Sequence, residues 1–327
     1  MQLTSSAIAP LPGSPVDDLG FVRSHAIAMV LIAAFLVAAP AFIYPMLPMK
    51  VMCYALFAAS FNLIYGYTGL LPFGHAAFFG MGAYAAAWAA KSFGLTPEIA
   101  IAIGGLVGAA LGAAIGAFSV RAKGLVFAMT TLALAQLVYF VCLQAPGTGG
   151  ENGIQDIPRG RLLGVWSLES DYAMYALVTL VFFGAGWAYY RSIHSPFGQV
   201  LVAIREHEDR TRSLGFNVLR YKWAIFTLSA LLAGIAGGTK ALVFGVATLT
   251  DVQIETSSLV LLMAIVGGSG SVFGPLAGAV VVVLMENSLA QYESWVSVLK
   301  GCVLVACVMV FKQGIVGELA SRMRTRI

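Results

Sequence analysis

The sequence predicts an all-α polytopic membrane protein with about 8–10 transmembrane or re-entrant helices. Only 10% of its 327 residues are charged and the mean hydropathy is +0.87, whereas about 25% of the residues in a soluble domain are charged. A helix needs roughly 20 apolar residues to cross a bilayer, and the alternation typical of membrane β-strands is missing. Long runs without Asp, Glu, Lys or Arg include 51–90, 99–120, 124–150, 172–190, 223–239 and 256–285.

The two ends of the chain differ from its apolar middle. Residues 1–25 are rich in Pro and Ser, and we expect them to form a disordered tail. The apolar run 26–44 is expected to remain as the first span, because it does not follow the basic start of a cleaved signal peptide. The transmembrane domain is expected to cover 26–315, with a basic tail at 316–327.

The positions of Lys and Arg predict the orientation, because these residues gather in short cytoplasmic loops. Six of them lie in 191–222, and others lie in the turn 121–123 and in the C-terminal tail, so these segments are predicted to be cytoplasmic. The connection 145–171 holds more acidic than basic residues and is predicted to lie outside. The predicted cytoplasmic and outside positions of these loops are consistent with membrane crossings at about 125–144, 172–190, 223–243 and 298–313.

Two uncharged runs are too long for one crossing, and each contains a break rich in Gly and Pro, at 66–75 and at 267–275. A single crossing over 256–286 would leave the basic C-terminus outside, so this segment is expected to enter, break and return. Paired broken segments indicate internal duplication and a transport site, but glycine clusters also serve helix packing alone. The predicted hinge residues are Gly66, Gly69, Pro72, Gly74, Gly267, Gly270, Gly274 and Pro275.

Few ionisable residues lie at membrane depth, so we expect neutral polar groups to line a translocation path. For His75, which follows the first break, a structural hydrogen bond is favoured over contact with a solute. Lys240 is expected to snorkel from the outer end of its span, and Glu286 is expected to lie at a helix end. The predicted path residues are Thr68, His75, Thr131, Gln136, Ser269 and Ser271, although such groups often only join helices.

A glycine stripe predicts close helix packing in the run 99–120. Its members recur every four residues, which leaves one helix face smooth enough for a neighbouring backbone to approach closely. Either another helix of this chain or a second subunit could lie there. The stripe consists of Gly104, Gly108, Gly112 and Gly116.

Motifs for enzymes and for metal or nucleic-acid binding are missing. The sequence has no H-E-x-x-H, G-x-S-x-G or G-x-x-x-x-G-K motif, so no catalytic residue and no cofactor are expected. Basic residues lie at span ends, which argues against nucleic acid as a partner. No metal site is expected, because all four cysteines lie in apolar runs without ligand spacing, namely Cys53, Cys142, Cys302 and Cys307.

The segment 191–222 holds nine of the thirty-four charged residues and is predicted to contain an amphipathic cytoplasmic helix. Ser195 followed by Pro196 is a typical helix start, and Gly215 is a plausible stop. Two i,i+4 ion pairs are expected on its polar side, Glu206 with Arg210 and Glu208 with Arg212.

The apolar side of this predicted helix requires cover. A helix that lies flat on lipid usually has a mostly basic polar face, whereas this polar face mixes both signs. Docking in a groove of a partner protein is therefore favoured over docking on lipid. The apolar stripe consists of Phe197, Val200, Leu201 and Ile204.

Several segments together resemble the LivM-type permeases of branched-chain amino acid ABC importers, and the resemblance covers about residues 50–315. Arg210 and Arg212 make the segment more basic than in that family, and Lys240 stands where the family usually has an apolar residue. The similar segments are Gly66-Tyr-Thr-Gly-Leu-Leu-Pro-Phe-Gly-His75 and its continuation to Ala87, Lys123-Gly-Leu-Val-Phe-Ala-Met-Thr-Thr-Leu-Ala, Thr148-Gly-Gly-Glu-Asn-Gly-Ile154, Ala203-Ile-Arg-Glu206, Leu214-Gly-Phe-Asn217, Gly267-Gly-Ser-Gly-Ser271 and Gly274-Pro275.

The resemblance implies a type II ABC importer permease of the bacterial inner membrane, with branched-chain amino acids as the favoured solute. Its partners would be a LivH-type permease subunit, two ABC ATPase subunits and a periplasmic solute-binding protein. The segment 191–222 would couple the permease to an ATPase subunit, through Phe197, Ile204, Arg205, Glu206, Leu214 and Gly215.

Two other classes of protein remain to be weighed against this one. A secondary transporter or channel for a small neutral solute such as urea or an amide would share the broken helices. It would need a coupling-ion site, yet carboxylates at membrane depth are nearly absent. An intramembrane enzyme is disfavoured by the missing catalytic groups.

Overall fold

The computed structural model describes residues 44–289 apart from 163 and 165, together with residues 40, 301 and 314. The predicted N-terminal tail, the first span, the crossing near 298–313 and the basic C-terminal tail fall outside its continuous part.

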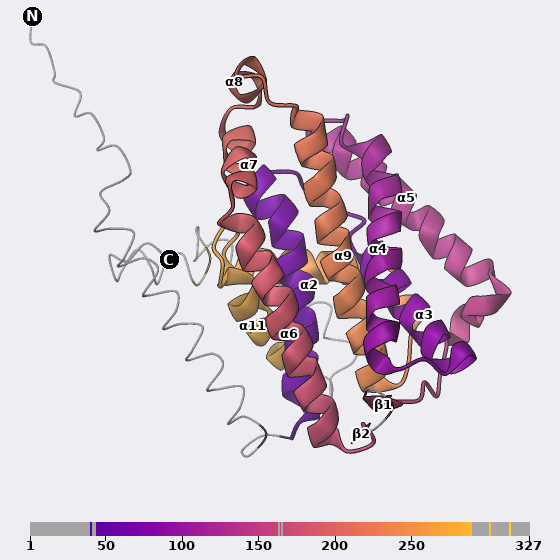
Figure 1. The fold of residues 1–327 in the computed structure, drawn as a ribbon. Helices are drawn as coiled ribbons and strands as arrows, with labels where there is room; N and C mark the ends of the chain where they lie inside the picture. The colour runs from indigo at the N-terminus through magenta and orange to yellow at the C-terminus, as the bar shows by residue number, and fades with distance from the viewer. Residues whose placement is uncertain are drawn as a thin grey trace, which may run out of the picture.

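The described residues are mainly helical, as Figure 1 shows. Five of the helices, α2, α4, α5, α6 and α9, are long and apolar enough to cross a membrane, and α3, α10 and α11 are shorter apolar helices. The helices are α2 (Met46–Thr68), α3 (Ala76–Phe93), α4 (Pro97–Ser119), α5 (Gly124–Gln144), α6 (Asp171–Ile193), α7 (Pro196–Glu206), α8 (Glu208–Ser213), α9 (Val218–Phe244), α10 (Ile254–Gly267) and α11 (Gly274–Leu289).

The connection between α5 and α6 is the only place where the described residues form strands. Two two-residue strands, β1 (Arg161–Leu162) and β2 (Trp166–Ser167), pair antiparallel; the sequence did not predict them. Three short 3-10 helices complete the loops, η1 (Pro146–Thr148), η2 (Gly150–Asn152) and η3 (Leu249–Asp251).

Helix α9 lies at the centre of the bundle, between α2 and α4 in Figure 1. The glycine stripe of α4 packs directly on it: a Cβ atom on Gly108 would lie 2.7 Å from the carbonyl oxygen of Ala230, and one on Gly112 would overlap the Ala230 side chain. Removing the side chain lets two backbones approach closely. The stripe is therefore covered by this chain's own helix, which settles the question that the sequence left open.

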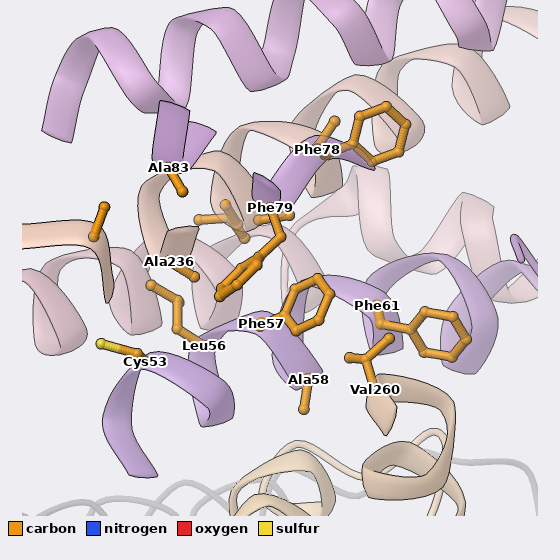
Figure 2. Packing of buried hydrophobic residues seen from close by; sticks show 14 of the residues in the cluster. Cys53, Leu56, Phe57, Ala58, Phe61, Phe78, Phe79, Ala83, Ala236 and Val260 are labelled. Carbon is orange, nitrogen blue, oxygen red and sulfur yellow. The ribbon is translucent and has the colours of Figure 1, made fainter. Parts of the chain in front are cut away.

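An aromatic cluster fills the space between α2 and α3. Figure 2 shows the Phe57 ring of α2 beside the Phe79 ring of α3, together with Phe61 and Phe78 on the same two helices, and all four side chains are at most 1% exposed. The ring centroids of Phe57 and Phe79 are 4.4 Å apart. Aromatic contacts of this kind add to the packing of large apolar side chains, so this cluster fixes α3 against α2 beyond the first break.

Both predicted breaks are present. Helix α2 ends at Thr68, and Gly69 follows with a left-handed φ of 71°, a conformation that glycine adopts without steric cost. Helix α10 ends at Gly267, and the chain turns through Gly268 and Gly270, with φ of 107° and 89°, before α11. Helices α10 and α11 then pack side by side, as expected for a segment that enters and returns.

The expectation that Lys240 snorkels to the interface is wrong. Its Nζ donates to both carboxylate oxygens of Asp251, at 2.9 and 2.7 Å, and the two residues are only 9% and 4% exposed. Asp251 also accepts from the amide and hydroxyl of Thr248. Because η3 brings this carboxylate within reach, the ammonium group is neutralised inside the protein and needs no path to the interface.

We expect Lys240→Met to lower the melting temperature of the detergent-solubilised protein strongly. Removing one member of a buried ion pair leaves an uncompensated charge and costs about 3–5 kcal/mol. The double variant Lys240→Met/Asp251→Asn should recover most of the loss, because the amide oxygen can still accept from Thr248. Intrinsic fluorescence melting measures both variants. Equal instability of the single and double variants would contradict the assigned pairing.

Candidate functional site

The segment 191–222 forms two short helices and not the single helix predicted. Helix α7 starts as expected, with Ser195 Oγ accepting from the amide of Gly198 at 3.4 Å. His207, with φ −148° and ψ 87°, then breaks the helix before α8. Glu206 and Arg210 therefore lie on different helices, and no ion pair between these two described residues forms.

The end of the segment follows the prediction more closely. Gly215 has a φ of +91° and lies just beyond α8, as expected for a residue that stops a helix. Of the two predicted ion pairs, the one between Glu208 and Arg212 forms, at 3.2 Å.

The apolar stripe of α7 does not face outward for a partner, contrary to the prediction. Leu201 and Ile204 are 1% and 3% exposed, because α7 folds back on α2, α6 and α9 of the same chain. The ring of Phe197 stacks on Tyr221 with centroids 5.5 Å apart. The sequence showed that this face needed cover but not that the neighbouring helix ends would supply it.

A different apolar surface of the segment is exposed. Leu214 is 72% exposed, and Phe216 and Leu219 are 40% and 44% exposed. Leu214 and Phe216 lie in the turn between α8 and α9, and Leu219 lies in the first turn of α9; we call residues 214–219 the exposed turn. Of the residues predicted to contact an ATPase subunit, Leu214 and Gly215 lie in this turn.

Glu208 holds α8 in place through three cations. Its carboxylate accepts from Lys222 at 2.9 Å and lies 3.2 Å from Arg212 and 3.3 Å from Lys123. Burial raises the pKa of Glu208, but the hydrogen bonds and charges of Lys222 and Lys123 outweigh that effect and hold the pKa below its ordinary value. One carboxylate thus joins α8, the start of α9 and the turn after α4.

Arg205 connects α7 to the first break. Its Nη1 donates to the carbonyl oxygen of Gly66, which belongs to the last turn of α2, where carbonyl groups lack partners within the helix. The same nitrogen is 3.3 Å from the position that a Cβ on Gly270 would occupy. One side chain of the coupling segment therefore reaches the residues of both breaks.

Asn62, which was not among the predicted site residues, joins α2 to the second break, one helical turn before Gly66. Its Nδ2 donates to Tyr189 Oη at 2.9 Å and to the Ser271 carbonyl at 3.0 Å, while its Oδ1 accepts from the Gly270 amide at 3.0 Å. The side chain is fully buried. An amide side chain in a long apolar run, one helical turn before Gly66, was the available signal.

Three of the predicted path residues lie buried around the first break. His75 is fully buried and its Nε2 lies 2.9 Å from Ser60 Oγ, so the favoured structural hydrogen bond is confirmed; its side chain does not cap α3. Thr131 Oγ1 accepts from the amide of Phe73 at 3.3 Å. Thr68 is 5% exposed and donates to a carbonyl within α2.

The other predicted path residues are distributed elsewhere. Ser269 is exposed and Gln136 is half-buried, while Ser271 Oγ donates to the Gly268 carbonyl at 3.0 Å. A cavity of about 380 Å³ lies between α2, α6 and α11 and is lined mainly by apolar groups, including Leu56, Phe183 and the predicted hinge residue Pro275. None of the six predicted path residues lines it, and their role in transport stays a prediction.

Comparisons with known proteins identify the family of this chain. A family model described as "branched-chain amino acid transport system / permease component" matches residues 45–308. The chain is 28% identical over 287 residues to the high-affinity branched-chain amino acid transport system permease protein LivM of Salmonella typhimurium and to that of Escherichia coli. Each alignment covers 81% of this chain and 68% of the relative.

Another relative is named as part of a sugar transport system. The xylose transport system permease protein XylH of Escherichia coli is 25% identical over 178 residues, which cover 51% of this chain and 44% of the relative. No solved structure matches this chain. With apolar spanning helices and a family match over most of its length, the chain is a multi-pass membrane protein that belongs to the branched-chain amino acid transport permease family of ABC transporters.

Proposed function

We propose that this chain forms part of the path by which an ABC importer moves branched-chain amino acids across the bacterial inner membrane. Its partners would be a LivH-type permease subunit, two ABC ATPase subunits and a periplasmic solute-binding protein. The observation that carries the proposal is Arg205, which joins the segment 191–222 to the end of α2 at Gly66. ATP hydrolysis would take place on the ATPase subunits.

The solute is inferred from the relatives. LivM of two bacteria is described as a branched-chain amino acid permease, whereas the match to the xylose permease is shorter. A pentose sugar is therefore the second candidate. The alternative of a secondary transporter or channel loses its support, because the family consists of ABC permeases.

We place the segment 191–222 and the C-terminus in the cytoplasm and the connection 145–171 outside, from the distribution of Lys and Arg. The permease domain would extend over 26–315, between the N-terminal tail 1–25 and the basic tail 316–327. In this orientation the external connection would face the solute-binding protein.

Coupling would begin at the exposed turn. Leu214 and Gly215, with Glu206 on α7, would contact an ATPase subunit, while Glu208 keeps α8 attached to the bundle. Phe197 and Ile204 would support α7 from its buried side. Movement of α7 would reach the broken helices through Arg205, because its guanidinium group touches α2 at Gly66.

Uptake in proteoliposomes tests the proposal. The chain is reconstituted with its permease partner and ATPase subunits, and ATP-dependent uptake of labelled leucine and labelled xylose is measured with the cognate binding protein outside. Leucine uptake that needs ATP supports the proposal. Uptake of xylose but not of leucine would contradict the proposed solute. Uptake without ATPase subunits would contradict the proposed role as an ABC importer permease.

We expect Leu214→Glu to weaken the affinity of the permease for an ATPase subunit by roughly tenfold or more, because burying a leucine contributes about 1.5–3 kcal/mol. Gln199→Glu is the matched control, since it adds the same charge at an exposed position of α7 outside the exposed turn. Titration of labelled ATPase subunit onto permease in nanodiscs gives both dissociation constants. Equal weakening in the two variants would argue against docking at Leu214.

We expect Glu208→Gln to lower the melting temperature of the permease, because Lys222, only 3% exposed, loses its ionised partner at a cost of about 1–3 kcal/mol. Glu206→Gln is the control, since Glu206 forms no ion pair among the described residues. The lowered pKa of Glu208 in the fold means that its contribution is present above its unfolded pKa of about 4.3. It is lost as the pH falls through the lower folded pKa.

The difference in melting temperature between wild type and Glu208→Gln should therefore be constant from neutral pH to about pH 5 and shrink in stronger acid. Melting curves across this pH range measure it. A difference that grows as the pH falls would have the wrong sign for an ionised Glu208.

A further inference from the structure

One neutral side chain connects α2, just before the first break, to the second break. Asn62 uses both donors and its acceptor, on Tyr189 of α6 and on the backbone of Gly270 and Ser271 in the second break. Gly270 and Ser271 have no regular helical partners there, because the chain between α10 and α11 is irregular. Asn62 therefore replaces the hydrogen bonds that a continuous helix would have made for itself.

The packing beside Asn62 is equally close. A Cβ on Gly66 would overlap Asn62 Oδ1 and would lie 2.8 Å from the Gly270 amide nitrogen. Residues 62 and 66 are one turn apart on α2, so they move together as parts of a rigid helix. The last two turns of α2 thus present the bare backbone at Gly66 and the side-chain amide of Asn62 to the second break.

Arg205 contacts α2 at Gly66, through the carbonyl of that residue, and its guanidinium group lies beside Gly270. A displacement of α7 changes the position of that carbonyl and, with it, of the Asn62 amide. The second break can move with the Asn62 amide, because Gly268 and Gly270 have a left-handed backbone and can act as a hinge that absorbs a change of φ and ψ.

We infer that Asn62 is a positioning residue of the transport cycle, which makes the second break move with the first when the ATPase subunits displace α7. This inference rests on the proposed function, because it needs an ATPase-driven movement of α7. Asn62 acts through the backbone of Gly270 and Ser271 and not by touching the solute.

Two spin-label distances in the full complex test this inference. In a chain without its four cysteines, one pair of labels is attached to Arg121→Cys and Ala203→Cys and reports the position of α7. A second pair at Arg121→Cys and Ser269→Cys reports the position of the second break. All three sites are exposed, and each pair is measured without nucleotide and after trapping with ATP and vanadate.

With Asn62 present, both distances should change on trapping. In Asn62→Leu the α7 distance should change as before, while the change at the second break should fall to less than half. Asn62→Ala is measured alongside, so that a failure of the leucine variant to assemble does not decide the outcome. Tyr189→Phe is the control, because it removes the bonds of the Tyr189 hydroxyl to Asn62 and Tyr67 but leaves the bonds from Asn62 to the second break, and it should keep both changes.

Each outcome bears on a different statement. If the second break still moves fully in Asn62→Leu or Asn62→Ala, the inference is overturned while the coupling role of α7 stands. If α7 does not move on trapping in the chain that retains Asn62, the proposed coupling itself is overturned. Loss of movement in Tyr189→Phe as well would show that the contact with α6, and not the link between the breaks, is what matters.

Discussion

The contact between the two breaks is the constraint on which the rest of the functional architecture depends. A broken helix in a membrane leaves backbone amides and carbonyls without partners, and each must be satisfied inside the protein. Here Asn62 satisfies the Gly270 amide and the Ser271 carbonyl, and Arg205 satisfies the Gly66 carbonyl. Asn62 lies on α2 and Arg205 lies on α7. The side chains that satisfy these backbone groups therefore also connect the coupling segment to α2 and to the second break.

The surrounding helices provide a rigid frame for the contacts of Asn62 and Arg205. Glycines on α4 allow its backbone to approach α9 closely, and the Phe57 and Phe79 rings hold α3 against α2. The buried pair of Lys240 and Asp251 joins α9 to η3 by charge. Close packing of this kind transmits a displacement, and the glycines of the breaks are where the backbone can change conformation most easily.

The sequence predicted those features that depend on local composition. Uncharged runs predicted the long helices, the Gly and Pro clusters predicted both breaks, and Ser195 predicted the start of α7. The helix partner of Gly108, the pairing of Lys240 and the cover of Ile204 could not be predicted. Each depends on which distant segments meet, and periodicity shows only that a surface needs cover.

Asn62 illustrates the same limit in the functional site. A polar residue at membrane depth attracts attention, but its three partners lie on α6 and in the second break, more than a hundred residues away along the chain. Charged residues were easier to find, since lipid excludes them, and they led to the segment 191–222. The contacts among α7, α2 and the second break use both kinds of group. The charged side chain of Arg205 reaches α2 from outside the apolar runs. The neutral amide of Asn62 connects α2 to the second break at a buried position, where a charge would be too costly to bury.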